Sequence, residues 1–363
     1  MNINERVEQA LTKHDLDLIQ YQNGQIKDAL STINNLQIEI IAEIKRAEPR
    51  NKRELQLLLG TVDAAIDRTY AAMAMESIGS LTEFAVAESQ AVSTISSRVF
   101  RAPIAPKILP KSIALEIVET TLAPNDALGT TIAERWNRQR DGTKGNIRDG
   151  LNYAIKNDQT LDDMLRILRG NRALQFRDGV MAKSKRGAEM IVRTATDAVA
   201  NSSRLATYKR NSDTIAGIQA NAVLDSRTTV LCRTRNGYAW HLESGKPFRG
   251  TPISFPGTPP WHFNCRTTLA PIFKSLEDLQ SVLDPVLNDE IVKRGETFPI
   301  DGKPAPMPSF KTTFDAMSEA ERRSTLGPGR LKLYNEGKIT LKDLLDQQGR
   351  QLTLKELKAR YGD

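Results

Sequence analysis

The side chains best suited to chemistry lie close together in this sequence. One stretch of 53 residues holds both cysteines, two of the three histidines and two of the three tryptophans. Within it, Cys232 is followed 30 residues later by a His-x-x-Cys pair, His262 and Cys265. Thiolate and imidazole ligands suit a soft divalent cation such as zinc, and His241 or Asp225 would supply a fourth ligand. The alternatives are a cysteine pair that can be oxidised and a metal-free brace held by hydrogen bonds.

The spacing favours the metal-free brace. The stretch has no close Cys-x-x-Cys pair, which is the strong zinc signature, so we expect no cofactor and keep zinc as the alternative. The residues between the two clusters are mostly Gly, Pro and aromatic, so they offer little regular backbone hydrogen bonding to hold the loop. We expect Phe255, Trp261 and Phe263 to bury apolar surface there while the polar side chains pair across the closure.

Three arginines, Arg227, Arg233 and Arg266, lie beside these polar residues. A guanidinium donates several hydrogen bonds, so each could fix a loop by binding carbonyls or the nearby Asp225. Contact with phosphate is the alternative role. We expect the structural role because Asp225 is a close partner in sequence.

Catalytic signatures are sparse. Metal-dependent nucleases need several carboxylates, yet Glu243 is the one acidic residue between 226 and 273. The sequence has no G-x-x-x-x-G-K-[ST] loop of an NTP-driven motor. A Cys-His hydrolase would also need an orienting third residue and an oxyanion site, which no motif indicates. We therefore expect no enzymatic activity.

The elements that must position these residues are mainly helical. Residues 1–100 carry capping-box spacing at Asn2, Asn51 and Ser80, each followed three residues later by Glu. After the second start, apolar residues recur at intervals of three and four, which predicts one amphipathic helix face: Leu55, Leu59, Val62, Ile66, Tyr70 and Met73.

The rest of the chain divides by composition. We expect a fold that is mainly α with a small, irregular α+β module. In the module, the runs VLC, GYAW and RTTLAPI predict short strands and turns. The expected regions are a Pro-rich linker at 101–112, a helical region with a basic helix at 113–220, the Cys/His module at 221–294, a second Pro-rich linker at 295–310 and a short helical tail at 311–363.

Positive charge is concentrated in one segment. The whole formal net charge of +7 lies between residues 171 and 235, which favours a surface facing a polyanion such as nucleic acid; an ordinary solvated helix face is the alternative. The candidate DNA-binding residues are Lys183, Lys185, Arg186, Arg193, Arg204, Lys209 and Arg210. The mean hydropathy of -0.42 and the lack of a long apolar stretch argue against a membrane span or secretion.

The module resembles the Mu F-like minor head protein family of tailed bacteriophages, also called the phage head morphogenesis family. The likeness rests on two separated clusters of motif residues, which occur in the order expected of the family. It extends over about residues 180–357, including the tail from Leu326 to Leu357. The motif positions are Asp225, Arg227, Thr228, Cys232, Gly237, Pro259, Pro260, His262, Asn264, Cys265 and Arg266, with Arg193 and Thr194 upstream. Many relatives carry further cysteines at the positions of Thr229 and Thr267, so this chain departs from the family there.

The resemblance implies a minor structural component of the virion. Such a protein would bind the portal protein inside the capsid, contact the major capsid or scaffold protein and the viral double-stranded DNA, and assist head assembly and DNA packaging or ejection. It would lie in the capsid interior near the portal, and in the host cytoplasm during assembly, with residues 1–100 as the docking region and no membrane partner. A DNA-binding protein, or a metal-dependent enzyme or effector of phage origin, is the alternative.

Overall fold

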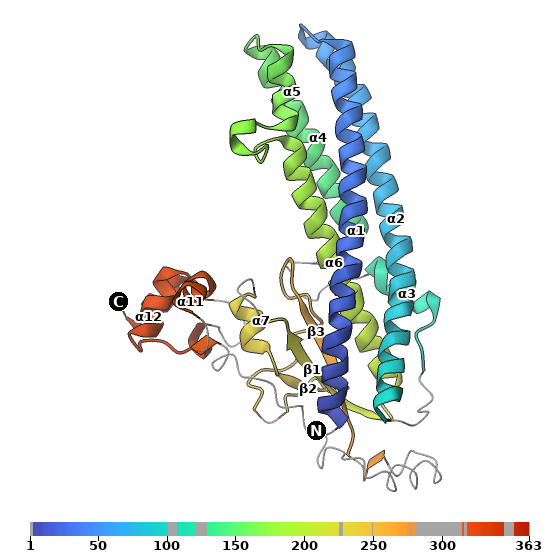
Figure 1. Cartoon of the computed structure of the whole chain (residues 1–363), viewed down its shortest axis with the longest axis vertical. Coiled ribbons are helices and arrows are strands. Elements are labelled where there is room, and N and C mark those ends of the chain that lie inside the picture. The colour runs from blue at the N-terminus through green and yellow to red at the C-terminus, as the bar shows by residue number, and fades with distance from the viewer. Residues whose placement is uncertain are drawn as a thin grey trace.

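The computed structural model describes most of the chain. The described residues are 3–100, 107–120, 129–224, 228–248, 250–275, 278–279, 314–315, 318–344 and 352–362. The architecture is mainly α-helical, with a small antiparallel sheet at one end of a long helical bundle (Figure 1). This confirms the fold class that the sequence predicts.

Two long helices form the main scaffold of the bundle. Helix α1 (Ile3–Ala47) and helix α2 (Lys52–Phe100) run antiparallel along the long axis (Figure 1), each about 70 Å long at 1.5 Å per residue. The predicted start at Asn51 is confirmed, because its side chain accepts from the amide of Glu54 while Glu54 accepts from the amide of Arg50. The predicted start at Ser80 is wrong. Helix α2 continues through it because Leu81 and Ala85, four residues apart on one helix face, are both buried in the bundle core.

Four more helices complete the bundle: α3 (Lys111–Thr120), α4 (Ile132–Lys156), α5 (Leu161–Arg169) and α6 (Val180–Arg210). Capping boxes at Thr131 and Thr160 begin α4 and α5. The apolar face predicted for α2 is buried in this bundle core from Leu55 to Met73. Small residues of α6 such as Ala188 and Ala195 pack in the same core, where their short side chains allow the helices to approach closely.

The sheet joins the bundle at its lower end. It consists of β1 (Ile215–Ala222), β2 (Ala239–His241) and β3 (Thr267–Phe273), in the order β2-β1-β3 with antiparallel pairing. The runs GYAW and RTTLAPI are therefore correctly predicted as strands. The boundary drawn at residue 220 instead falls inside β1, and the stretch called helical up to that point ends at Arg210.

The run VLC is helical rather than extended. It begins α7 (Val230–Arg235), a short helix whose N-cap, Thr229, accepts a hydrogen bond from the amide of Cys232. An N-cap hydroxyl stabilises the first turn, which outweighs the β preference of a valine at the first position.

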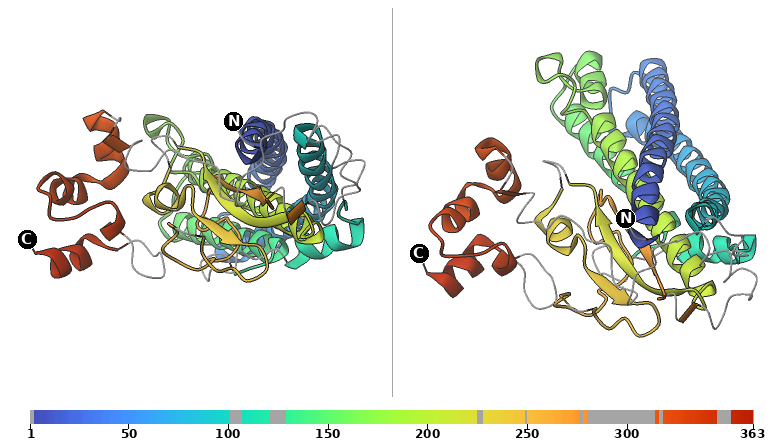
Figure 2. Two further views of the ribbon diagram at one scale, coloured as in Figure 1. Left: turned by 90° about the horizontal axis from the view of Figure 1, so that it is seen from below. Right: turned by 60° about the horizontal axis from the view of Figure 1, so that its bottom comes forward.

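The C-terminal helices form a cluster with its own small core. They are α11 (Glu319–Leu326), α12 (Pro328–Asn335), the 3-10 turn η2 (Lys342–Leu344) and α13 (Leu354–Tyr361). Their apolar residues pack together with Val230 of α7, so the cluster lies beside the sheet module and away from α1 and α2 (Figure 2). Thr340 with Asp343, and Thr353 with Glu356, make capping contacts.

Some predicted features lie outside the described residues. They include the linker at 295–310, the first half of the linker at 101–112, and Asn2. The boundary drawn at residue 112 is wrong, because α3 already begins at Lys111. Of the described helices, none is long and apolar enough to cross a membrane.

Candidate functional site

The two predicted clusters of reactive residues meet in the structure. Cys232 lies in the first turn of α7, and its Sγ is 3.0 Å from Nε2 of His262 and 3.5 Å from Sγ of Cys265. The two cysteines are almost fully buried, whereas His262 is partly exposed. Because both thiols are free, the contact is not a disulfide. These three side chains are called the Cys/His cluster below.

The loop that carries His262 and Cys265 is held from several sides. The indole of Trp261 is buried under the guanidinium of Arg235, 4.5 Å from its ring centre, and donates to the carbonyl of Gly257. Asn264 has φ 58, in the left-handed region that asparagine tolerates, and its amide donates to Thr194 Oγ1 of α6. The loop is thus fixed to α6 as well as to α7.

The prediction for the three aromatic residues holds in part. Trp261 is buried and Phe255 packs against Trp240 of the module core at 5.3 Å between ring centres. Phe263 instead remains 44% exposed, with the guanidinium of Arg135 5.9 Å from its ring centre. Its neighbours in the turn direct it outwards, because His262 and Cys265 occupy the inner side of the loop.

Hydrogen bonds orient the members of the cluster. Nδ1 of His262 is 2.8 Å from the carbonyl of Phe263, and Nε2 is 2.9 Å from Oγ1 of Thr229. The amide of Cys265 donates to the carbonyl of His262. The imidazole therefore has one nitrogen fixed by its own loop and the other directed at α7.

The two thiols have opposite pKa shifts. Burial raises the pKa of Cys232, but hydrogen bonds from Cys265, Thr267 and Thr229 outweigh it, so the net shift is downward. Burial raises the pKa of Cys265 well above its usual value, and the neighbouring sulfur of Cys232 adds to this. Because the two pKa values shift in opposite directions, Cys232 loses its proton before Cys265 as the pH rises.

The remaining motif positions surround this cluster with different roles. Gly237 has φ 81 and its amide donates to the carbonyl of Ala220 in β1, so a side chain there would strain the turn. Pro260 is buried directly before Trp261. The backbone carbonyl of Arg266 accepts from Val223. Asp225 and Arg227 lie outside the described residues.

Arg233 has the structural role that the sequence predicts. It is fully buried, and its Nε donates to the carbonyl of Thr228 at 2.8 Å. By contrast, the prediction of His241 as a metal ligand is wrong. Its exposed ring stacks on Phe248 at 4.0 Å between ring centres, because β2 directs it to the surface, and it is not part of the Cys/His cluster.

The predicted DNA-binding residues do not form one continuous face. Arg204 is the clearest correction, because it is fully buried and bound by two carboxylates. Lys185 is half-buried and donates to Gln37 of α1, and Arg193 pairs with Glu189. Lys183 and Arg186 are exposed near the start of α6, and Lys209 and Arg210 are exposed at its end, about 40 Å away along the helix.

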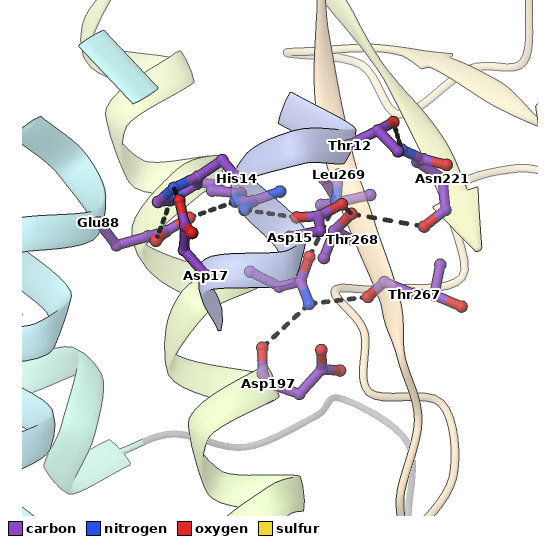
Figure 3. A network of polar contacts seen from close by, with 12 residues as sticks. Thr12, His14, Asp15, Asp17, Glu88, Asp197, Asn221, Thr267, Thr268 and Leu269 are labelled. Carbon is purple, nitrogen blue, oxygen red and sulfur yellow. Dashed lines mark hydrogen bonds and ion pairs between the residues drawn. The ribbon is translucent and has the colours of Figure 1, made fainter. Parts of the chain in front are cut away.

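A buried polar network between α1, α2, α6 and β3 was not predicted (Figure 3). Arg204 of α6 donates to Glu88 of α2 at 2.5 Å and to Asp15 of α1 at 2.8 Å. Asp15 also accepts from Thr268 of β3, and Glu88 contacts His14 at 2.8 Å. On α6, polar residues occupy a face that would be apolar if the helix packed through hydrophobic contacts alone. These polar residues are the sequence signal that could have indicated the network.

The same network closes the outer edge of β3. Asn201 of α6 donates to the carbonyl of Thr267 and accepts from the amide of Leu269, and Asn4 of α1 accepts from the amide of Phe273. These side chains supply the hydrogen bonds that a fourth strand would make. Near them, burial raises the pKa of Asp197 well above its usual value, which favours the neutral carboxyl.

The geometry limits what the Cys/His cluster can do chemically. A cysteine sulfur 3.0 Å from an imidazole nitrogen resembles a nucleophile with its base, but Cys232 and Cys265 are only 2% and 1% exposed, so a substrate could not reach either sulfur in this conformation. The same three side chains also suit a soft cation. A scan with protein-family models finds no match for this chain, and comparisons with curated proteins and with solved structures find none either.

Proposed function

We propose that this chain is a structural protein of a tailed-bacteriophage head, bound at the portal vertex inside the capsid. The observation that carries the proposal is the meeting of the two motif clusters on which the resemblance to Mu F-like proteins rests. Cys232 from the first cluster touches His262 and Cys265 from the second. Residues that belong to one structural motif are expected to lie together in space, and these do although 30 residues separate them.

A structural role fits the burial of the reactive groups. The cysteines lie inside the module core with Trp240 and Trp261, so their contacts fix loops and do not face a cleft. We accordingly assign the chain no turnover and treat the module as a rigid unit. The bundle formed by α1 and α2 extends from this unit and offers a long surface to other proteins (Figure 1).

The partners that we propose are the portal protein, the major capsid or scaffold protein and the viral DNA. In the bundle, Ile38 of α1 and Leu57 of α2 are 66% and 72% exposed. Apolar side chains that are so exposed are candidates for contact with a partner protein. Such contacts would place the chain in the capsid interior, after assembly in the host cytoplasm, where it assists head assembly and DNA packaging or ejection.

The test is co-purification with the portal protein encoded beside this chain. Deletion of residues 1–100 is not informative, because Val7 and Leu11 belong to the core that contains the sheet. A double variant, Ile38→Glu with Leu57→Glu, should keep the fold and reduce the recovered complex at least about tenfold, which corresponds to about 1.4 kcal/mol.

The matched control is Asn34→Glu with Gln56→Glu, which adds the same charge at exposed positions of the same helices. It should bind the portal as the unmodified chain does. If the unmodified chain does not co-purify with portal, procapsid or scaffold protein, the proposed function is wrong.

A DNA-binding protein remains the second candidate. It is favoured by exposed arginines around the turn between α5 and α6, Arg169, Arg172 and Arg177, which lie near Lys183 and Arg186. A head protein would bind DNA without sequence preference, whereas a regulator would bind one defined site. Competition between specific and random duplexes distinguishes them.

A further inference from the structure

We propose that Cys232, His262 and Cys265 hold one soft divalent cation, zinc by ligand chemistry, which staples the loop at 257–266 to α7. The inference does not depend on what the chain assembles with, so it stands or falls separately from the proposed function. It rests on the orientation of the imidazole, the spacing of the three donors and the charge of the site.

The imidazole presents a lone pair to the two sulfurs. Nδ1 of His262 is 2.8 Å from the carbonyl oxygen of Phe263, and a carbonyl only accepts, so Nδ1 carries the hydrogen. In the neutral ring, Nε2 therefore presents a lone pair, and this atom lies 3.0 Å from Sγ of Cys232 and 2.9 Å from Oγ1 of Thr229. Histidines that bind metals usually donate their other N–H to a carbonyl or carboxylate in this way.

The donor atoms are spaced almost as a tetrahedral site requires. All three lie within 4.8 Å of one another. Zinc at about 2.3 Å from sulfur and about 2.0 Å from nitrogen would place two sulfurs about 3.8 Å apart, and a sulfur and a nitrogen about 3.5 Å apart. The observed separations are 3.5 Å between the sulfurs and 3.0 Å between Cys232 Sγ and His262 Nε2. Side-chain shifts of a few tenths of an ångström would open the cluster to accept the ion.

Electrostatics also favour the loaded cluster. Both cysteines are nearly inaccessible to water, and a buried thiolate without a cation is costly. Two thiolates, a neutral imidazole and one Zn²⁺ sum to zero charge, so the complete set places no net charge in the core. The loaded cluster would join α7 to the loop through bonds stronger than the hydrogen bonds of the free side chains.

The fourth position would lie beside Thr229. Its Oγ1 is 2.9 Å from Nε2 of His262, on the N-cap of α7. This hydroxyl, or a water molecule next to it, would complete the coordination. Three protein ligands with one open position bind a metal ion less tightly than four ligands do. A substitution that adds a ligand atom at Thr229 therefore tests the geometry.

The experiment uses the full chain, purified under reducing conditions, stripped with a chelator and titrated with Co²⁺. Cobalt bound by thiolates in a tetrahedral site gives strong visible bands and a thiolate charge-transfer band. We expect one equivalent per chain, displacement by one equivalent of Zn²⁺ and a higher melting temperature after zinc is added.

Single ligand variants test which residues bind. Cys232→Ser, Cys265→Ser and His262→Gln should each lower the cobalt affinity by more than about 100-fold, since even partners outside the ligand shell are worth about 10- to 100-fold. His241→Gln, which removes the exposed histidine stacked on Phe248, is the matched control and should bind as the unmodified chain does. Circular dichroism confirms that each variant is folded.

Thr229→Cys keeps the proposal testable even if a ligand variant fails to fold. A sulfur at this position should tighten zinc binding at least about tenfold and strengthen the charge-transfer band, since it adds a fourth ligand. The proposal is overturned if the unmodified chain binds no cobalt, including the case in which only Thr229→Cys binds it. It is also overturned if the ligand variants bind as well as His241→Gln, or if Thr229→Cys binds zinc no more tightly than the unmodified chain.

Discussion

Arg204 and Asp15 form an ion pair across 189 residues of sequence, with 2.8 Å between Nη2 and Oδ1. The arginine side chain is wholly inaccessible to water, and its second carboxylate partner, Glu88, is 1% exposed. This contact joins α6 to α1 and, through Glu88, to α2, at the level where the bundle meets the sheet (Figure 3). The connection between the helical bundle and the Cys/His module therefore depends on buried charges as well as on apolar packing.

Loss of the positive charge of Arg204 should destabilise the fold strongly. Arg204→Met leaves two carboxylates buried without their partner, so we expect the free energy of unfolding to fall by about 3–5 kcal/mol in urea denaturation. Arg193→Met is the matched control, because its ion pair with Glu189 is partly exposed and should be worth less than about 1 kcal/mol. Equal losses in the two variants would show that the network carries no special stability.

The same network should make the protein sensitive to acid. Burial raises the pKa of Glu88, but the charge of Arg204 and the hydrogen bond with His14 outweigh it and lower the pKa to about 2. A carboxyl with a lowered pKa stabilises the fold above its unfolded value of 4.5, and this contribution is lost as pH falls from 4.5 toward about 2. Burial raises the pKa of Asp15, so its protonation acts in the opposite direction.

Glu88→Gln isolates this contribution. In urea denaturation at several pH values, the stability difference between the unmodified chain and the variant should be largest at about pH 5. It should decline above pH 6.5, because the hydrogen bond with Glu88 raises the pKa of His14 and this contribution is lost as the pH rises through the raised pKa. It should also shrink as the pH is lowered from about 5, because the unmodified chain loses the contribution that the variant never had. A difference that stays constant down to the acid limit would contradict the assignment.

Asn201 should stabilise the edge of the sheet. Asn201→Ala leaves the carbonyl of Thr267 and the amide of Leu269 without their side-chain partner, and each buried group left unsatisfied costs about 1–3 kcal/mol. We expect a loss of about 2–4 kcal/mol and faster hydrogen exchange of the Leu269 amide. Asn152→Ala on α4, where the side chain is exposed, should change neither value; unchanged exchange at Leu269 in Asn201→Ala would contradict the role.

The exposed basic residues should bind DNA through charge alone. A triple variant, Arg172→Glu, Lys183→Glu and Arg186→Glu, should weaken binding to random duplex DNA and reduce the slope of log affinity against log salt, since fewer phosphates are neutralised. Fluorescence anisotropy across a salt series measures both.

The control for this prediction is Lys209→Glu with Arg210→Glu, at the far end of α6. It should have a smaller effect if the surface near the α5–α6 turn is the one that faces DNA. An unchanged salt slope in the triple variant would identify these residues as an ordinary solvated surface.

Local signals in the sequence were sufficient for much of the fold. The apolar residues from Leu55 to Met73 predict the buried face of α2, and Asn51 with Glu54 predicts its start. Both succeed because the interacting residues are three or four positions apart, so the helix itself brings them together. The same local logic fails at Ser80, where a start signal lies inside a helix that tertiary packing prolongs.

The site could be predicted only as a set of residues, and their arrangement was decided by the tertiary structure. The sequence identified Cys232, His262 and Cys265 as chemically distinctive, but the fold of the loop between them determined that they meet and that His241 does not. Arg204 is the clearest example. A charge count places it on a basic surface, whereas Asp15 and Glu88 draw it into the core. Sequence determines which charges exist, but the environment of a charge depends on partners brought near by folding, and these lie 116 and 189 residues away.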